Sequence, residues 1–406
     1  MKKHSYILLM ACAAIAGAAL LCGCSKSEGG IRLSGPIQFG MVSRGGQTTK
    51  TVYGDDVEKD GKKYQRLDWV AGDKITIASP QALVQNDASE NPARAADYVI
   101  SQVLDAVAGD PQRKAKVSND GANGLMYDEK YEGAYTFYGI YPKAEAGVIS
   151  LTDAGAVSAT IPASQTLGTT STKSESKEYT VGEETTTLTV NYTVYAPNMK
   201  YAFMTAAETL TPVNEQQTIP LTFNPAFTAF EFNVSSQDEE EIDLTEFELV
   251  SPEKNDDYPG FVQDKLAGTF SMTAGDNSTV SVSSDAGSSI KVDLSSTDAI
   301  NATHGLSFTV FTVPVTNQSP LRIRFTSKDG EPETEGGEQP TKTSYLDLKY
   351  SNNEAAGTNA GKAVQFLAGH KYRIHMLKLP SSQWKITIAP DFDEWIQAEE
   401  KIVIYI

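Results

Sequence analysis

Hydrophobic and polar residues alternate along most of this chain. Residues 230–234 and 321–325, for example, carry an apolar side chain at every second position. A period of two is typical of strands that bury one face and expose the other. The pattern predicts strands at 37–42, 69–77, 135–141, 221–234, 242–249, 290–294, 306–315, 321–325, 345–350, 372–379 and 384–388. Long amphipathic helices are hard to find, and only 93–107 fits a helix and a strand equally well.

Many short strands without helical crossovers predict an all-β protein built from β-sandwiches rather than an α/β sheet. A length of 406 residues is enough for two domains. Pro212 lies in a polar run at 211–217 that follows apolar residues, so we expect one sandwich at 45–212 and another at 213–406. The polar stretch 164–187 is predicted to form a long hairpin or a mobile loop.

The first residues resemble a secretory signal. Lys2 and Lys3 precede an apolar run at 6–21, and Leu21 to Cys24 read Leu-Cys-Gly-Cys, which is a lipobox. The run is shorter than the roughly 18 to 20 residues that a membrane-spanning helix needs. The sequence therefore predicts that 1–23 is a signal peptide and that Cys24 becomes the acylated N-terminus of an outer-membrane lipoprotein precursor.

The cysteine count and the net charge exclude some classes of protein. The three cysteines, Cys12, Cys22 and Cys24, all lie in or beside the signal, so none is left for a disulfide in the body of the protein. The formal net charge is −18, and loss of Lys2 and Lys3 with the signal makes it more negative by two. Such acidity argues against nucleic acid as a partner.

Candidate catalytic residues are scarce. The four histidines, His4, His304, His370 and His375, lack the spacing of a zinc site, and we expect His370 and His375 to be surface or strand-end residues. Serine nucleophile elbows and phosphate-binding loops are missing from the sequence. Acidic neighbours such as Asp256 and Asp257, or Asp391, Asp393 and Glu394 beside Trp395, are expected to be solvated turns. We therefore predict no enzymatic activity, cofactor or metal.

Several strings together resemble one protein family. Residues 69–75, Trp-Val-Ala-Gly-Asp-Lys-Ile, resemble the W-x-x-G-D-x-I segment of fimbrillin-family proteins, the pilins of type V pili of Bacteroidales. Residues 37–39 followed by Ser43 and Arg44 are similar to the short strand and arginine that precede that segment in the family. The aromatic strand that ends at Tyr141 and Pro142, the segment 196–206, and 369–379 with Trp395 also resemble family segments.

This resemblance implies two transthyretin-like β-sandwich domains, exported as a lipoprotein and assembled into a surface fimbria. In such pilins an arginine-specific protease cuts the leader, and a strand of another subunit replaces the departing strand. Carried onto this chain, residues 24–44 form the leader and cleavage falls between Arg44 and Gly45. The exchangeable strand carries Ile37, Phe39 and Met41. The expected partners are other fimbrial subunits, with a host or bacterial surface as a further ligand.

The end of the chain suits the other half of such an exchange. Ile402, Ile404 and Ile406 alternate with Val403 and Tyr405, as the apolar contacts of a donor strand would. The same tail fits equally well as the last strand of its own sheet. Two other readings stay open: a monomeric outer-membrane lipoprotein that binds glycans through its three tryptophans, Trp69, Trp384 and Trp395, and a lipid-anchored glycoside hydrolase.

Overall fold

The computed structural model describes sixteen parts of the chain. They are residues 33–43, 52–59, 62–105, 107, 112–121, 123–181, 184–237, 239, 241–253, 263–314, 316–317, 320–328, 340–348, 364–379, 384–390 and 402–405. Strands β1 to β28 make up the regular structure of these residues, together with a single turn of 3₁₀ helix at Met199–Tyr201. The predicted all-β class is confirmed. None of the described helical residues forms a segment long and apolar enough to cross a membrane.

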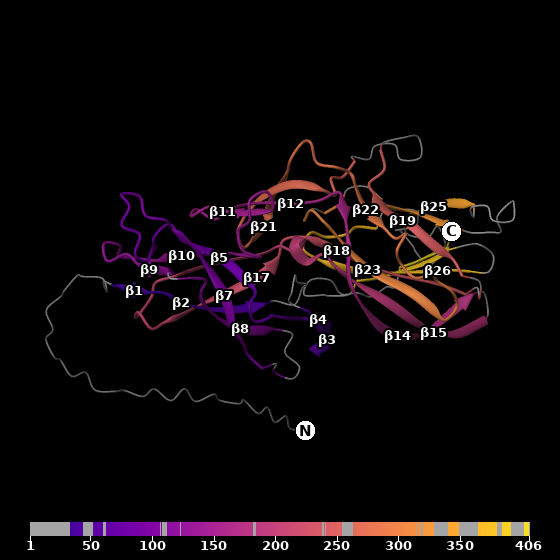
Figure 1. The fold of residues 1–406 in the computed structure, drawn as a ribbon, viewed down its shortest axis with the longest axis horizontal. Helices are drawn as coiled ribbons and strands as arrows, with labels where there is room; N and C mark the ends of the chain where they lie inside the picture. Colours follow the sequence, from indigo (N-terminus) through magenta and orange to yellow (C-terminus); the bar gives the residue numbers. More distant parts are fainter. Residues whose placement is uncertain are drawn as a thin grey trace, which may run out of the picture.

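Seven strands from the first 225 residues close into a barrel, drawn mainly in indigo and purple in Figure 1. Around the barrel the order is β10, β16, β17, β2, β8, β7, β5. Their bounds are Tyr135–Tyr141, Met204–Leu210, Thr218–Pro225, Gln38–Ser43, Arg113–Asn119, Ala95–Val103 and Lys74–Ala78. The undecided stretch 93–107 is thus mainly a strand, β7. Closure leaves none of these seven strands with a free edge.

A small sheet lies beside the barrel. Its order is β1 (Gly35–Pro36), β9 (Leu125–Tyr127) and β6 (Leu83–Val84). The hairpin of β3 (Val52–Lys59) and β4 (Lys62–Asp68) forms a separate two-stranded sheet. Aromatic side chains fill the barrel, because alternate positions on β10 and its neighbours point inward. Tyr135, Phe137 and Tyr141 belong to this core, as their alternation predicted.

Two larger sheets enclose the second core. One has the order β13, β22, β19, β24, β25, with bounds Ser164–Gln165, Ser289–Asp293, Asp243–Val250, Arg322–Lys328 and Thr341–Asp347. The other has the order β14, β15, β23, β18, β26, β27, β28, with bounds Leu167–Val181, Glu184–Pro197, His304–Thr312, Thr228–Ser236, Lys371–Lys378, Trp384–Pro390 and Ile402–Tyr405.

The two sheets pack face to face. Phe232 on β18 and Phe247 on β19 have ring centroids 4.5 Å apart, and Phe325 on β24 lies 4.6 Å from Trp384 on β27. A four-stranded sheet of β11 (Ile149–Leu151), β12 (Ala156–Ile161), β20 (Gly268–Thr273) and β21 (Asp276–Val282) also contributes to this core. This half of the molecule is a β-sandwich, as the alternation of its sequence predicts.

The two cores divide the chain differently from the predicted limit at 212. The predicted hairpin at 164–187 is present as β14 and β15, and β15 pairs in parallel with β23. Strand β12 pairs with β20, so residues before 212 help to build the second core. Strand β17, after 212, completes the barrel. The domain limits themselves stay a prediction, but hydrogen bonding joins strands from both sides of residue 212.

Candidate functional site

Strand β2 carries the residues that the sequence assigned to the exchangeable leader. It pairs in parallel with β17 at six positions, from Gln38 opposite Thr218 to Ser43 opposite Phe223. On its other side it pairs antiparallel with β8 at four positions, Gly40 to Ser43. Because both sides of β2 are bonded, the strand closes the barrel. We call the space it fills between β17 and β8 the leader slot.

The three predicted leader side chains point into the barrel core. Ile37, Phe39 and Met41 are buried, whereas Gln38 between them is exposed. The Phe39 ring makes edge contacts with Tyr98 and Phe137, at centroid distances of 5.3 and 5.2 Å. Burial of three such side chains contributes about 5 to 9 kcal/mol at about 1.5 to 3 kcal/mol each. Loss of β2 would expose this apolar lining together with unpaired backbone groups of β17 and β8.

The C-terminal end of β2 is hydrogen-bonded to β8 through Ser43. The buried Ser43 hydroxyl donates to the Arg113 carbonyl at 3.3 Å and accepts from the Arg113 N–H at 3.2 Å. Trp69 donates from its indole Nε1 to the same carbonyl at 3.2 Å. Arg44 and Gly45 follow at once in the sequence but lie outside the described residues, as does Cys24. Cleavage and lipid attachment at these residues therefore stay predictions.

The N-terminal end of the leader contacts Glu215, a residue that no sequence motif marks. The Ser34 N–H donates to Glu215 Oε1 at 2.7 Å, and the Ser34 hydroxyl lies 3.2 Å from the same oxygen. The Ile37 N–H donates to the Leu125 carbonyl at 2.9 Å. Glu215 lies in a polar run for which the sequence predicts only a loop. Its contact with Ser34, 181 residues away, is what distinguishes it from its neighbours.

The C-terminal tail occupies a different kind of position. Strand β28 is the last strand of the seven-stranded sheet and pairs antiparallel with β27 alone, with Ile402 opposite Ile388 and Ile404 opposite Ile386. Ile406 lies outside the described residues. The tail is therefore bonded within its own chain along one side, and its use as a donor for another subunit stays a prediction.

Two of the tryptophans expected to serve a glycan-binding surface are buried. Trp69 is 3% exposed and packs edge-on against Tyr141 and Phe223, at centroid distances of 5.5 and 5.7 Å. Trp384 is 7% exposed and packs against Phe325. Neither presents an accessible ring face, so neither could serve the glycan-binding alternative as a stacking platform. Trp395 lies outside the described residues.

The three described histidines lie in or directly before strands β23 and β26. His304 Nε2 lies 3.2 Å from Thr193 Oγ1, and His370 Nδ1 lies 2.8 Å from the Ala368 carbonyl. His375 is only 8% exposed, which corrects the expectation of a surface residue, because β26 lies inside its sheet. Among the described residues, no group of three or more His, Cys, Asp or Glu could hold a metal ion. Asp256, Asp257, Asp391, Asp393 and Glu394 lie outside them.

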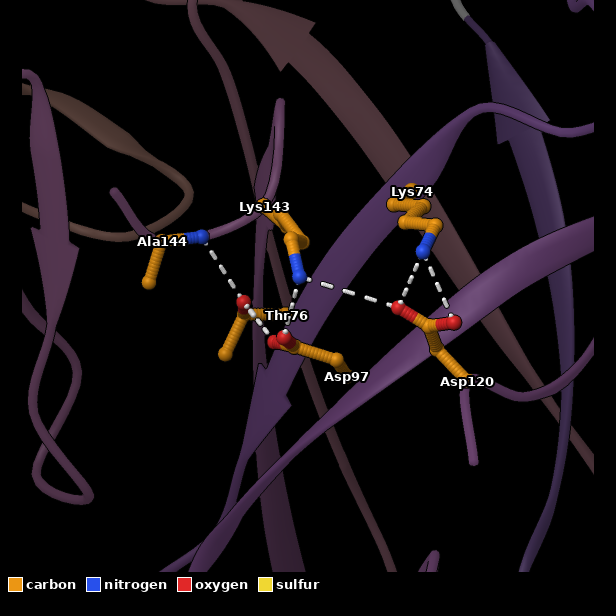
Figure 2. Close-up of polar contacts among 6 residues, drawn as sticks. All are labelled: Lys74, Thr76, Asp97, Asp120, Lys143 and Ala144. Carbon is orange, nitrogen blue, oxygen red and sulfur yellow. Dashed lines mark hydrogen bonds and ion pairs between the residues drawn. The ribbon is translucent and has the colours of Figure 1, made fainter. Parts of the chain in front are cut away.

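A network of charged side chains lies on the barrel surface and is shown in Figure 2. Lys74 Nζ lies 2.8 Å from Asp120 Oδ2, and Lys143 Nζ lies 3.1 Å from Asp97 Oδ2 and 3.7 Å from Asp120 Oδ2. The hydrogen bond from Lys74 lowers the pKa of Asp120, and the bond to Asp97 raises the pKa of Lys143. Each ion pair joins residues of different elements. The network therefore connects β5, β7 and the end of β8 to the segment after β10.

Of the comparisons with known proteins, the one with solved structures gave matches. No family model matches the chain, and no curated protein matches it. A solved structure named "putative cell adhesion protein" from Bacteroides ovatus is 14% identical, with a TM-score of 0.46, over 88% of this chain and 97% of that one.

Two solved fimbrial proteins are also similar. A fimbrial assembly protein from Parabacteroides distasonis is 9% identical, with a TM-score of 0.36, over 92% of this chain and 100% of that one. The tip fimbrial protein Mfa3 from Porphyromonas gingivalis is 9% identical, with a TM-score of 0.33, over 91% of this chain and 98% of that one. The names of these structures are those of cell adhesion or fimbrial proteins.

Proposed function

We propose that this protein is a structural or adhesive subunit of a surface fimbria, exported as a lipoprotein and polymerised by strand exchange after leader cleavage. The observation that carries the proposal is the position of β2. A strand bonded on both sides, with alternate buried side chains, is followed in the sequence by Arg44. A cut there would convert a part of the fold into a separate peptide that another strand can displace.

The two edges of the leader slot give a replacement strand its binding energy. The backbone groups of β17 and β8 would supply hydrogen bonds independent of side-chain identity, and the barrel lining would select apolar residues at every second position. The tail residues Ile402, Ile404 and Ile406 have this spacing. In the proposal they leave the edge of their own sheet and enter the slot of another subunit.

The predicted lipid at Cys24 implies the order of anchoring, cleavage and assembly. The precursor is held at the outer membrane through Cys24 until the leader is cut, and the body of the protein then joins the fimbria at the cell surface. The partners are other fimbrial subunits, and adhesion would engage a ligand on a host or bacterial surface. The chemistry of assembly is strand pairing, so the proposal requires no cofactor.

Mass spectrometry of the protein recovered from cells tests the proposal. We expect a mature N-terminus at Gly45 and, on gels of unboiled samples, ladders of polymer. Arg44→Lys keeps the positive charge but removes the side chain that an arginine-specific protease recognises, so this variant should keep acylated Cys24 and form no ladder. Arg66→Lys is the matched control and should behave like the unmodified protein. Acylated Cys24 on all the unmodified material would indicate an anchor or a monomeric binder instead.

A further inference from the structure

The head of the leader is fastened by one carboxylate. Glu215 Oε1 accepts the Ser34 N–H at 2.7 Å and lies 3.2 Å from the Ser34 hydroxyl. Its other oxygen lies over Gly35, where an added Cβ would be 3.6 Å from Oε2. Gly35 has φ +117°, so another residue there would be strained. The leader backbone therefore approaches Glu215 closely at Ser34 and Gly35, beyond the end of β2.

The loop that carries Glu215 is ordered by its own side chains. The Gln216 N–H donates to Asn214 Oδ1 at 3.0 Å, and the Val213 N–H donates to Gln217 Oε1 at 2.9 Å. Neither bond involves the leader. The loop leads directly into β17, whose first residue, Thr218, lies opposite Gln38. Glu215 is thus positioned by the wall of the leader slot and would keep its place after the leader leaves.

A buried hydroxyl and a cavity lie beside this contact. Tyr127 is opposite Gly35 in the β1–β9 pair and fully buried, and its hydroxyl has no hydrogen-bond partner among the described residues. Burial, with the charges of Tyr135 and Glu215, raises the pKa of Tyr127 to about 12. A cavity of about 320 Å³ is lined in part by Leu33, Tyr131 and Tyr135. The cavity therefore reaches the leader at Leu33, the residue before Ser34.

We propose that Glu215 is a positioning residue for strand exchange, which retains the head of the cut leader and selects the strand that replaces it. The inference rests on the function proposed above. When the leader leaves, the carboxylate loses two hydrogen-bond donors. An incoming strand with a hydroxyl or ammonium group at the level of Ser34 restores a charge-assisted bond, whereas one with a carboxylate there is repelled. The contact thus favours strands by charge at a point where the apolar contacts do not.

The test uses the full chain cut after Arg44 and labelled peptides of residues 33–43. In the unmodified protein, the peptide with Ser34→Lys should bind about tenfold more tightly than the peptide with Ser34→Glu. In Glu215→Gln this preference should fall to within about twofold, and the natural leader should leave about three- to tenfold faster. Gln216→Ala, which changes the adjacent side chain of the same loop, should match the unmodified protein in both measurements.

Each outcome decides a separate question. If peptides exchange but Ser34→Lys and Ser34→Glu bind the unmodified protein alike, the inference about Glu215 is wrong and the proposed strand exchange stands. This arm needs no protein variant, so it holds even if Glu215→Gln folds poorly. If no peptide of any sequence enters the cut chain, the proposed exchange fails and the role of Glu215 fails with it.

Discussion

The leader strand and the tail strand differ in how the fold holds them. Strand β2 is bonded on both sides inside a closed barrel, and it contributes Phe39 and Met41 to the core, next to Ile37 just before it. Strand β28 is bonded on one side at the edge of an open sheet. Removal of β2 opens a barrel and empties part of a core. Removal of β28 only moves the sheet edge to β27.

In the strand exchange proposed above, this difference favours a different role for each strand. A strand that closes a barrel leaves a vacancy with two backbone edges and an apolar lining, so its slot is the better acceptor. A strand at an edge can detach without opening a core, so it is the better donor. In the proposal, cleavage is needed on the acceptor side alone, because the leader is the strand that continues into the barrel through the residues after Ser43.

The largest effect is expected from Phe39→Ala. Phe39 fills the barrel core between Tyr98 and Phe137, and truncation of a buried phenylalanine costs about 3 to 5 kcal/mol. We expect the free energy of unfolding of the barrel to fall by this amount in the intact chain, measured by chemical denaturation. Gln38→Ala, at the exposed neighbouring position, is the control and should change little. Equal effects of the two substitutions would show that β2 is not part of the core.

The second effect concerns the sheet that carries the tail. Glu231 on β18 pairs with Lys371 and with Arg373 Nε at 2.8 Å, both on β26. Burial acts to raise the pKa of Glu231, but the attraction of Lys371 and Arg373 outweighs it and holds the pKa well below its ordinary value. Glu231→Gln would remove the carboxylate charge that pairs with buried Lys371 and with Arg373, which costs about 3 kcal/mol.

Denaturation of Glu231→Gln and of a control separates the inner strands from the edge. Glu246→Gln removes a similar contact, from Arg324 Nη2 at 2.7 Å, but on a carboxylate that is 45% exposed. We expect this control to lose under about 1 kcal/mol. Should both variants lose the same stability, the inner strands β18 and β26 would not be the part that holds the seven-stranded sheet together.

A smaller loss is expected when 402–406 are deleted. The deletion removes the four residue pairs between β27 and β28, and we expect a loss of about 1 to 2 kcal/mol in the second half of the molecule, at about 0.5 to 1.5 kcal/mol per net hydrogen bond. The barrel should unfold as before, and no ladders should form on unboiled gels. Ladders that persist after this deletion would rule out the tail as the donor.

Local features of the fold were predictable from the sequence. Aromatic residues at every second position followed by Pro142 predicted a strand at 135–141, which is β10. The alternation at 37–42 predicted β2 to within one residue at either end. Stretch 93–107 stayed undecided because apolar residues such as Val99 also occupy its outer face, which weakens the period of two.

The pairing of strands could not be predicted in the same way. Alternation shows which face of a strand is buried but not which strand lies beside it, so the parallel pairs of β2 with β17 and of β15 with β23 left no local signal. For the same reason, the pairing of strands from both sides of residue 212 could not be predicted. Glu215 was missed because its partner, Ser34, is distant in sequence, and the tryptophans were misjudged because composition does not report burial.

The smallest effect on stability is expected in the network of charged side chains on the surface of the seven-stranded barrel. The pKa of Asp120 is lowered from 3.8 mainly by its bond with Lys74, so its contribution to stability is present above pH 3.8 and is lost as the pH falls further. The pKa of Lys143 is raised from 10.5, so its contribution is present below pH 10.5 and is lost as the pH rises further. Solvent exposure and salt weaken both ionic contributions.

Thermal unfolding between pH 2 and 5 should therefore show a shallower dependence of the unfolding temperature on pH for Asp120→Asn than for the unmodified protein at low salt. At high salt the two proteins should not differ. Asp153→Asn, which removes an exposed carboxylate elsewhere, should follow the unmodified curve. A curve for Asp120→Asn that runs parallel to the unmodified one at low salt would mean that the barrel owes its stability to the core around β2 alone.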